Sequence, residues 1–157
     1  MMGQNIFSEL LSVLKEKKLT LSTAESLTGG MLASSIVDIS GASKSFKEGF
    51  VTYCDEAKIR TLGVSPDTIK KHGAISEETA REMAEGAAKS SGCDIAVSTT
   101  GNAGPDCDEG KEAGLVYIGI YAYGAAEAFE FHFKGGRESV RKQTVAAAAK
   151  LLLDKLL

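Results

Sequence analysis

TAESLTGG, residues 23–30, joins two segments of different character. The run before it, residues 19–23, favours a β-strand, and residues 28–38 favour a helix. A strand that turns sharply into a helix leaves backbone N–H groups unpaired at the helix start, where they can bind an anion. The glycines allow close approach to the backbone, and the hydroxyls of Ser26 and Thr28 can cap a helix, bind a ligand or act as a nucleophile. We therefore predict a site here, with an ordinary capped turn as the alternative.

Two further loops of small residues follow apolar, strand-like runs. Residues 93–99 lead into TGNAGP at 100–105, and residues 127–133 lead into KGG at 134–136. In an open α/β sheet the ligand crevice lies beyond the strand ends, where such loops gather. The three loops therefore predict one shared pocket.

Helix-like and strand-like segments alternate along the rest of the chain. A hairpin of two adjacent strands, near 114–123 and 127–133, interrupts the alternation. The other expected elements are a helix at 4–17, a strand at 49–54, a helix at 56–62, helices beginning near Pro66 and Glu77, and a last helix at 137–156. This order predicts an α/β fold, a three-layer α/β/α sandwich with a mixed sheet of about five strands.

Composition places the chain among globular proteins. Its 157 residues are 43% hydrophobic and 25% charged, which is typical of one folded domain spanning residues 1–157. No apolar run approaches the roughly 20 residues that cross a bilayer, and the amino terminus lacks a signal-peptide pattern. We therefore expect a cytoplasmic protein without membrane contact. The net charge of −3 gives no reason to expect a nucleic-acid partner.

Metal sites and histidine-based triads both need residues that this sequence does not supply in the right pattern. The three cysteines are far apart and do not pair with the two histidines at ligand spacing, so we expect reduced thiols and no metal. His132 lies in an alternating strand, where exposure or packing explains it. A serine–histidine triad would need a histidine near Ser26, whereas a serine–lysine pair needs none. Lys58 is the candidate base, because burial lowers a lysine pKa; a solvated helix face is the alternative.

Two arginines stand at the start of the last helix, where the helix dipole disfavours a cation. Arg137 and Arg141 are easier to explain if they bind an anion, since the guanidinium fork matches phosphate or carboxylate. Pairing with Glu138 is the alternative. Two other charged residues, Glu25 and Glu56, are more typical of capping or solvent-facing carboxylates than of general acids.

Five stretches, in this order, resemble one known family. TAESLTGG is followed by EGFVTYCDEAKIRTLGV, HGAISEE, TGNAGP and GGRESVRKQ. From about Leu19 to Leu152 the chain resembles the CinA (competence/damage-inducible protein A) carboxy-terminal domain family. The resemblance implies an amidohydrolase that acts on a linear amide and needs no metal or organic cofactor. It would convert nicotinamide mononucleotide into nicotinate mononucleotide and ammonia, a step in pyridine nucleotide salvage.

The resemblance also implies roles for individual residues. Ser26 would be the nucleophile and Lys58 its base, with Tyr53 close by, and Thr100 would hold or polarise the reacting group. Arg137 would bind the nucleotide phosphate. Backbone amides of the glycines would complete the anion sites. The residues predicted to bind the substrate are Thr28, Gly29, Gly30, Gly101, Asn102, Arg137 and Arg141.

The sequence departs from the family pattern at several positions. Leu27, Asp55, Asn102 and Gly136 replace residue types that are common in the family, and segment 106–114 lacks the usual glycine-rich run. The acidic residues of that segment would disfavour a phosphate if the segment lines the site. The alternative function is therefore a nucleotide-binding protein of the same fold without catalytic activity.

Three further expectations concern assembly and partners. The family domain also occurs fused to a larger amino-terminal domain, and we expect this chain to match the stand-alone amidases. The apolar faces of the first and last helices predict a homo-oligomer, most simply a dimer, unless both helices only cover the sheet. A nuclease or other nucleic-acid role is suggested only by the family's name, and the acidic balance disfavours it.

Overall fold

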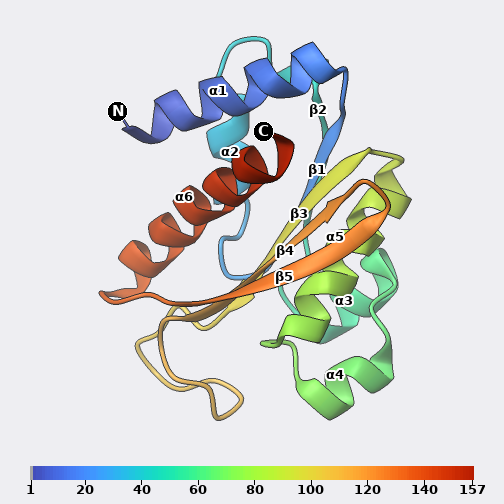
Figure 1. Cartoon of the computed structure of the whole chain (residues 1–157). Helices are drawn as coiled ribbons and strands as arrows, with labels where there is room; N and C mark the ends of the chain where they lie inside the picture. The colour runs from blue at the N-terminus through green and yellow to red at the C-terminus, as the bar shows by residue number, and fades with distance from the viewer. Residues whose placement is uncertain (1) are drawn as a thin grey trace.

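A five-stranded sheet runs through the middle of the molecule (Figure 1). The computed structural model describes residues 2–157, with side chains from Ile6 onward. The strands are β1 (Leu21–Glu25), β2 (Phe46–Val51), β3 (Ile95–Gly101), β4 (Leu115–Ala122) and β5 (Ala125–His132). Their order is β2-β1-β3-β4-β5, with β2, β1 and β3 parallel and with β4 and β5 antiparallel to their neighbours. The prediction of a mixed sheet is confirmed.

Helices cover both faces of this sheet, as the three-layer prediction requires (Figure 1). One face carries α1 (Met2–Lys17), α2 (Met31–Val37) and α6 (Arg137–Leu156), and the other carries α3 (Asp55–Leu62), α4 (Pro66–His72) and α5 (Glu77–Ser91). A short 3₁₀ turn at Ala42–Lys44 precedes β2. Because β1 and β3 are covered on both sides, nearly all of their residues are buried, whereas edge strand β2 is mostly exposed.

The larger hydrophobic cluster lies between the sheet and the α1–α2–α6 layer. Its members include Leu10, Ile36, Ile118 and Leu152, whose side chains are fully buried. A smaller cluster on the opposite face contains Met83 and alanines of α5. Small residues let α5 lie close to the strands.

Helix α5 also approaches the end of α3 closely. A Cβ atom placed on Gly86 would overlap the carbonyl oxygen of Leu62. Glycine at this helical position therefore serves close packing and not flexibility. The contact sets the position of α3, the helix that carries Lys58.

Several element boundaries differ from the sequence-based expectation. β2 begins and ends three residues earlier than expected, because its pairing with β1 starts at Phe46 and ends at Val51. β1 ends at Glu25, two residues later than expected, and β3 continues to Gly101 because it stays paired with β4. The hairpin turns at Tyr123 and Gly124, which both have positive φ, and not within residues 124–126.

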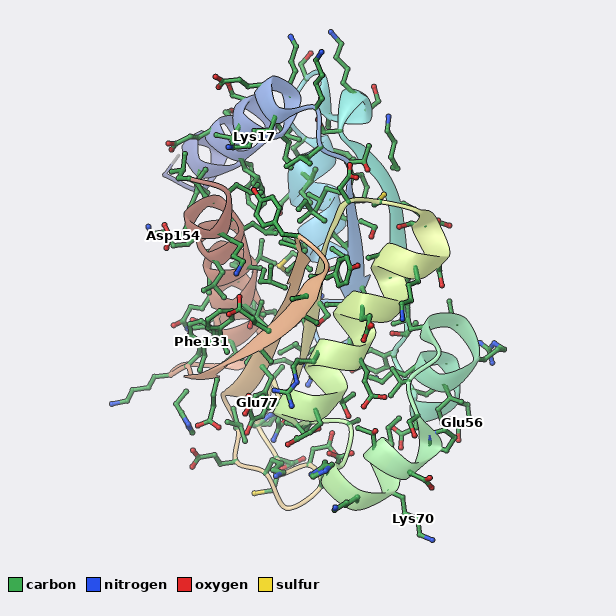
Figure 2. The ribbon with its side chains drawn as sticks, turned by 45° about the vertical axis from the view of Figure 1, so that its right-hand side comes forward. Lys17, Glu56, Lys70, Glu77, Phe131 and Asp154 are labelled. Atoms are coloured by element: carbon green, nitrogen blue, oxygen red, sulfur yellow. The ribbon has the colours of Figure 1, made fainter. Side chains whose placement is uncertain are left out.

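The apolar faces that suggested a dimer are used within the chain. Phe7, Leu10 and Leu14 of α1 are buried, and α1 lies across α6 in the same cluster (Figure 1). Charged residues such as Lys17 and Asp154 extend outward from these helices (Figure 2). The alternative, that both helices cover the sheet, accounts for the pattern. The oligomeric state stays a prediction that light scattering would test.

Candidate active site

The junction after β1 is built around a buried carboxylate. Glu25 is 0% exposed and accepts hydrogen bonds from the backbone N–H groups of Leu32 (2.7 Å) and Ala33 (3.1 Å). We predicted that these N–H groups at the start of α2 could bind an anionic ligand. In the structure the Glu25 carboxylate is the anion that binds them. The capping interpretation of Glu25 is confirmed. Glu56, by contrast, extends outward from α3 (Figure 2).

The two predicted glycines of this junction shape the turn. Gly29 and Gly30 have φ values of +56° and +103°, which residues other than glycine rarely adopt. The N–H of Gly29 donates to the carbonyl of Ser26 at 3.1 Å. That amide is therefore satisfied inside the turn, and the structure gives Gly29 a conformational role in place of the predicted anion contact.

Ser26 and Lys58, which are 32 residues apart in the chain, meet in a hydrogen bond. The Lys58 Nζ lies 3.0 Å from the Ser26 Oγ and donates to the Thr52 carbonyl at 2.8 Å. Lys58 is only 1% exposed, so the alternative of a solvated helix face is wrong. The Ser26 N–H donates to the Thr99 carbonyl at 2.9 Å, which holds the serine at the end of the sheet.

The surroundings of Lys58 favour the neutral amine. Burial lowers its pKa from the ordinary lysine value, and the nearby Asp55, Cys54 and Glu109 oppose that effect only in part. A neutral amine can still donate to the Thr52 carbonyl while its lone pair accepts the Ser26 hydroxyl proton. The pair can therefore act as nucleophile and general base.

Tyr53 and Arg137 form a second contact near this end of the sheet. The Arg137 guanidinium donates to the Tyr53 hydroxyl at 3.1 Å and to the Gly104 carbonyl at 2.7 Å. Glu138 pairs with Lys142 at 2.9 Å, so the alternative partner for Arg137 is taken by another residue. Arg137 is exposed and keeps further N–H donors that can bind an anion.

Arg141 holds the loop that carries Ser26. Its guanidinium donates to the carbonyls of Leu27 (2.9 Å) and Thr28 (3.0 Å). These bonds satisfy carbonyl groups in the turn between β1 and α2. The structure therefore gives Arg141 a positioning role, and its substrate contact stays a prediction.

Arg141→Met keeps the apolar stem and removes both hydrogen bonds. We expect unfolding free energy to fall by about 1–2 kcal/mol, because the guanidinium is partly buried and each bond is charge-assisted. Urea unfolding measures this, and Lys142→Met, at the exposed neighbouring position, is the control. An unchanged midpoint for Arg141→Met would contradict the positioning role.

Three other predicted ligands are committed to the scaffold. The Thr28 hydroxyl lies 2.7 Å from the Thr99 hydroxyl and is fully buried. The Asn102 side chain makes three hydrogen bonds within the loop at 102–111, so it organises that loop. At Gly101 a Cβ would lie 2.7 Å from the Leu115 carbonyl oxygen, so the residue is needed for strand packing. Each has a structural role in this structure, and its predicted contact with the substrate stays a prediction.

The comparisons with known proteins show the family of this chain. The family model of the CinA C-terminal domain matches residues 4–156. The chain belongs to the CinA C-terminal domain family.

Relatives of this CinA domain are found both as sequences and as solved structures. It is 46% identical, over 99% of its length, to a competence-damage inducible protein of Clostridium novyi, and 46% identical, over 97%, to one of Bacillus subtilis. It spans only 38% and 36% of those relatives' own lengths. These names describe a condition of induction and not a reaction.

Solved CinA-superfamily structures have the same fold. A Klebsiella pneumoniae protein superposes with a TM-score of 0.96 at 34% identity, with coverage of 98% of this chain and 97% of that one. The CihA protein of Agrobacterium tumefaciens gives 0.93 at 35% identity, with coverage of 97% and 94%. The α/β architecture of this CinA domain is therefore shared over nearly its whole length.

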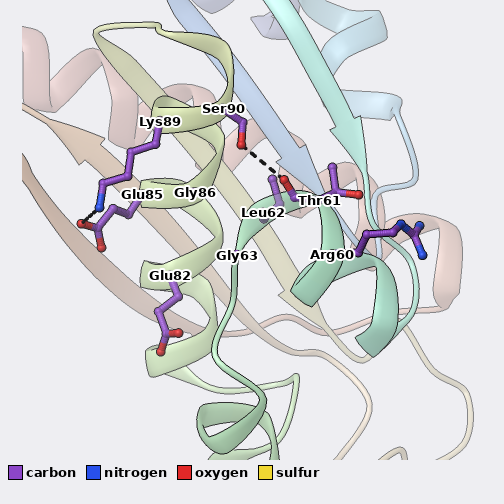
Figure 3. Close-up of a pocket in the computed structure, with 9 residues that line it drawn as sticks. All are labelled: Arg60, Thr61, Leu62, Gly63, Glu82, Glu85, Gly86, Lys89 and Ser90. Atoms are coloured by element: carbon purple, nitrogen blue, oxygen red, sulfur yellow. Dashed lines mark hydrogen bonds and ion pairs between the residues drawn. The ribbon is translucent and has the colours of Figure 1, made fainter.

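A separate groove of about 480 Å³ lies between α3 and α5 of the CinA domain (Figure 3). It contains none of the predicted site residues. Three of its charged groups have local partners: Glu85 pairs with Lys89, and the Glu82 carboxylate accepts bonds from Ser65 and Thr68. The groove offers no group comparable to the buried Ser26–Lys58 pair.

The described part of the CinA domain contains neither a metal-ligand cluster nor a membrane-spanning helix. Among the side chains described, from Ile6 onward, no three histidine, cysteine or acidic side chains gather as a metal site would need. None of its described helices is long and apolar enough to span a bilayer. The three cysteines are free, and His132 is exposed between Glu112 and Glu130, as its place in an alternating strand suggested.

One contact near Lys58 was not predicted from the sequence. The Glu109 carboxylate accepts hydrogen bonds from the backbone N–H groups of Ala74 (3.1 Å) and Ile75 (3.0 Å). The sequence marked its loop only as acidic. A carboxylate that reaches two amides 34 and 35 residues away has no signal in local sequence.

Proposed function

We propose that this CinA domain hydrolyses the carboxamide of nicotinamide mononucleotide, with Ser26 as nucleophile and Lys58 as general base. The observation that carries the proposal is the 3.0 Å contact between the Lys58 Nζ and the Ser26 Oγ at a buried site. Amide hydrolysis through an acyl-enzyme needs an activated hydroxyl of this kind. The choice of a pyridine nucleotide rests on the family resemblance.

The pair supports a two-step reaction in which one amine takes up and gives back a proton in each step. Lys58 takes the Ser26 hydroxyl proton as the oxygen attacks the carboxamide carbon. It then gives that proton to the departing nitrogen as the C–N bond breaks, so that ammonia leaves and the acyl group stays on Ser26 as an ester. In the second step Lys58 takes a proton from water as the water attacks the ester, and it gives this proton to the Ser26 Oγ as the ester C–O bond breaks. The acid product then loses its own proton to solvent and leaves as the carboxylate.

Thr100 has a narrower role in this proposal than the resemblance implies. Its hydroxyl proton is donated to the Ala74 carbonyl at 2.7 Å. The oxygen can still accept a bond from the carboxamide N–H₂ group, but it cannot also donate to a developing oxyanion. We therefore assign Thr100 to holding the amide nitrogen.

The direct test is an assay of ammonia and nicotinate mononucleotide formed from nicotinamide mononucleotide. Wild-type chain should form both in equal amounts, and Ser26→Ala should form neither above background. If calorimetry showed nucleotide binding while neither product formed, the domain would be a nucleotide-binding protein without catalysis.

Arg137→Ala tests the proposed phosphate contact. We expect affinity for nicotinamide mononucleotide to fall by about 10- to 100-fold, because a charge-assisted hydrogen bond contributes about 1.5–3 kcal/mol. KM should change more than kcat, since the contact lies away from the reacting carbon.

Two controls accompany this variant. Nicotinamide riboside lacks the phosphate, so its KM should be nearly the same for Arg137→Ala and wild type. Lys142→Ala changes the charge of the same helix at an exposed position and should leave both substrates unaffected. An equal loss on the riboside and the nucleotide would contradict the phosphate assignment.

A further inference from the structure

Two neighbouring backbone amides of this CinA domain converge on one carboxylate. The Glu109 Oε2 accepts from Ala74 at 3.1 Å, and its Oε1 accepts from Ile75 at 3.0 Å. One oxygen thus faces each N–H group. A pair of successive N–H groups aimed at one anion is a recognised form of anion site.

Side-chain hydroxyls hold these two peptide groups in place. The carbonyl of Gly73 accepts from Ser76 (2.9 Å) and Thr79 (2.7 Å), and the carbonyl of Ala74 accepts from Thr100 (2.7 Å). In a trans peptide the N–H points opposite to the C=O. The three hydroxyls therefore hold both N–H groups toward the carboxylate, whether or not Glu109 is present.

The amide pair lies beside the proposed catalytic residues. Thr100, which holds the Ala74 carbonyl, directly follows Thr99, whose own carbonyl accepts the Ser26 N–H at 2.9 Å. The Glu109 charge is also close enough to act on the Lys58 amine. The carboxylate therefore lies near the Ser26–Lys58 pair.

Glu109 occupies a backbone position that does not suit glutamate. It lies in a two-residue turn between Asp108 and Lys111, with φ of +54°, and Gly110 follows at +72°. Turns with two positive φ values favour asparagine at the first position. At Gly73 a Cβ would lie 2.7 Å from the Glu109 Oε1, so glycine leaves room for this contact. The carboxylate contact offsets an unfavourable turn.

We propose that the Ala74 and Ile75 amides form a carboxylate-binding subsite near the Ser26–Lys58 pair, which Glu109 occupies as an internal competitor of the carboxylate product. The identity of that product rests on the proposed function. The subsite itself rests on the amide pair and its hydroxyl supports. Segment 106–114 must release Glu109 before another carboxylate can bind there.

Glu109→Asn removes the contact with the two amides and keeps the turn, because asparagine suits the turn but is too short to reach both amides. In ¹H–¹⁵N NMR spectra of the full chain, the Ala74 and Ile75 amide protons should lie downfield in wild type and move upfield in Glu109→Asn. Millimolar sodium acetate should shift them back in the variant and leave wild type unchanged. Glu112→Gln, whose carboxylate contacts His132 instead, should match wild type throughout.

Nicotinate mononucleotide should bind Glu109→Asn about tenfold more tightly than wild type, if Glu109 is seated about nine-tenths of the time. Equal affinities would overturn the competition, and amide signals that acetate moves equally in both proteins would overturn the subsite. If the acetate response appears but neither wild type nor Glu109→Asn releases ammonia from nicotinamide mononucleotide, the subsite stands and the proposed amidase function fails.

Discussion

Lys58→Met is expected to lower kcat for amide hydrolysis by about 100- to 10,000-fold, the range that a positioned general base contributes. Methionine retains the length and apolar body of the side chain, so the buried space stays filled. Without the amine, nothing within hydrogen-bond distance of the Ser26 Oγ among the described contacts can take its proton. Lys70→Met, at an exposed position, is the matched control and should keep wild-type rates.

The pH profile gives this prediction a second readout. Because burial lowers the pKa of Lys58, kcat/KM should fall as pH drops through that pKa and the amine takes up a proton. Lys58→Arg cannot become neutral and should be inactive at every pH. A variant that kept wild-type kcat, or a wild-type profile with no loss toward acid, would remove Lys58 from the mechanism.

The lowered pKa of Lys58 should also make the free energy of unfolding depend on pH. The unfolded chain binds the Lys58 proton more readily than the folded chain, so its contribution to folding grows as pH rises toward the ordinary lysine value near 10.5. Urea unfolding at pH 7 and pH 9 should show a stability difference, wild type minus Lys58→Met, that increases with pH. A difference that decreased would contradict the lowered pKa.

Gly86→Ala is expected to lower the free energy of unfolding by about 2–4 kcal/mol. At most helical positions the same change stabilises a protein by up to about 1 kcal/mol, so the expected sign is reversed. The reason is the overlap between the added Cβ and the Leu62 carbonyl oxygen, which would force α3 and α5 apart.

The activity of Gly86→Ala should fall along with its stability, because α3 carries Lys58 and its displacement would lengthen the contact to Ser26. Lys89→Ala, one turn along the same helix and exposed, is the control and should stay within about 0.5 kcal/mol of wild type. Urea unfolding compares the two. A Gly86→Ala chain as stable as wild type would mean that the helices do not pack as described.

The layers of the fold were predictable because they depend on the period of the hydrophobic pattern and on the order of helices and strands along the chain. The buried strand β3 begins with a short apolar run, and the hairpin of β4 and β5 appears in the sequence as two strand-like runs with a short turn between them. The boundaries were less accurate, since the extent of β2 and β3 depends on which neighbour they pair with. Pairing is a tertiary property.

The candidate site divides in the same way. Ser26 and Lys58 could be named through the family motifs, and the structure brings their side chains together. The contacts of Arg141 and Asn102 within the protein could not be predicted, because their partners include backbone carbonyls that every residue offers. Glu25 and Glu109 likewise bind backbone amides, so identity alone does not distinguish a carboxylate that caps from one that meets a ligand.

The hydrogen bonds from Arg141 to the loop of Ser26 span 114 and 113 positions of the chain. A ribosome that adds about 5–20 residues per second would take roughly 6–23 seconds to make that intervening length. For that interval a nascent chain would carry its serine on a turn whose carbonyls have no guanidinium to hold them. The loop of Ser26 is therefore held in place only after α6 has been made. A chain truncated before α6 would hold its nucleophile loosely.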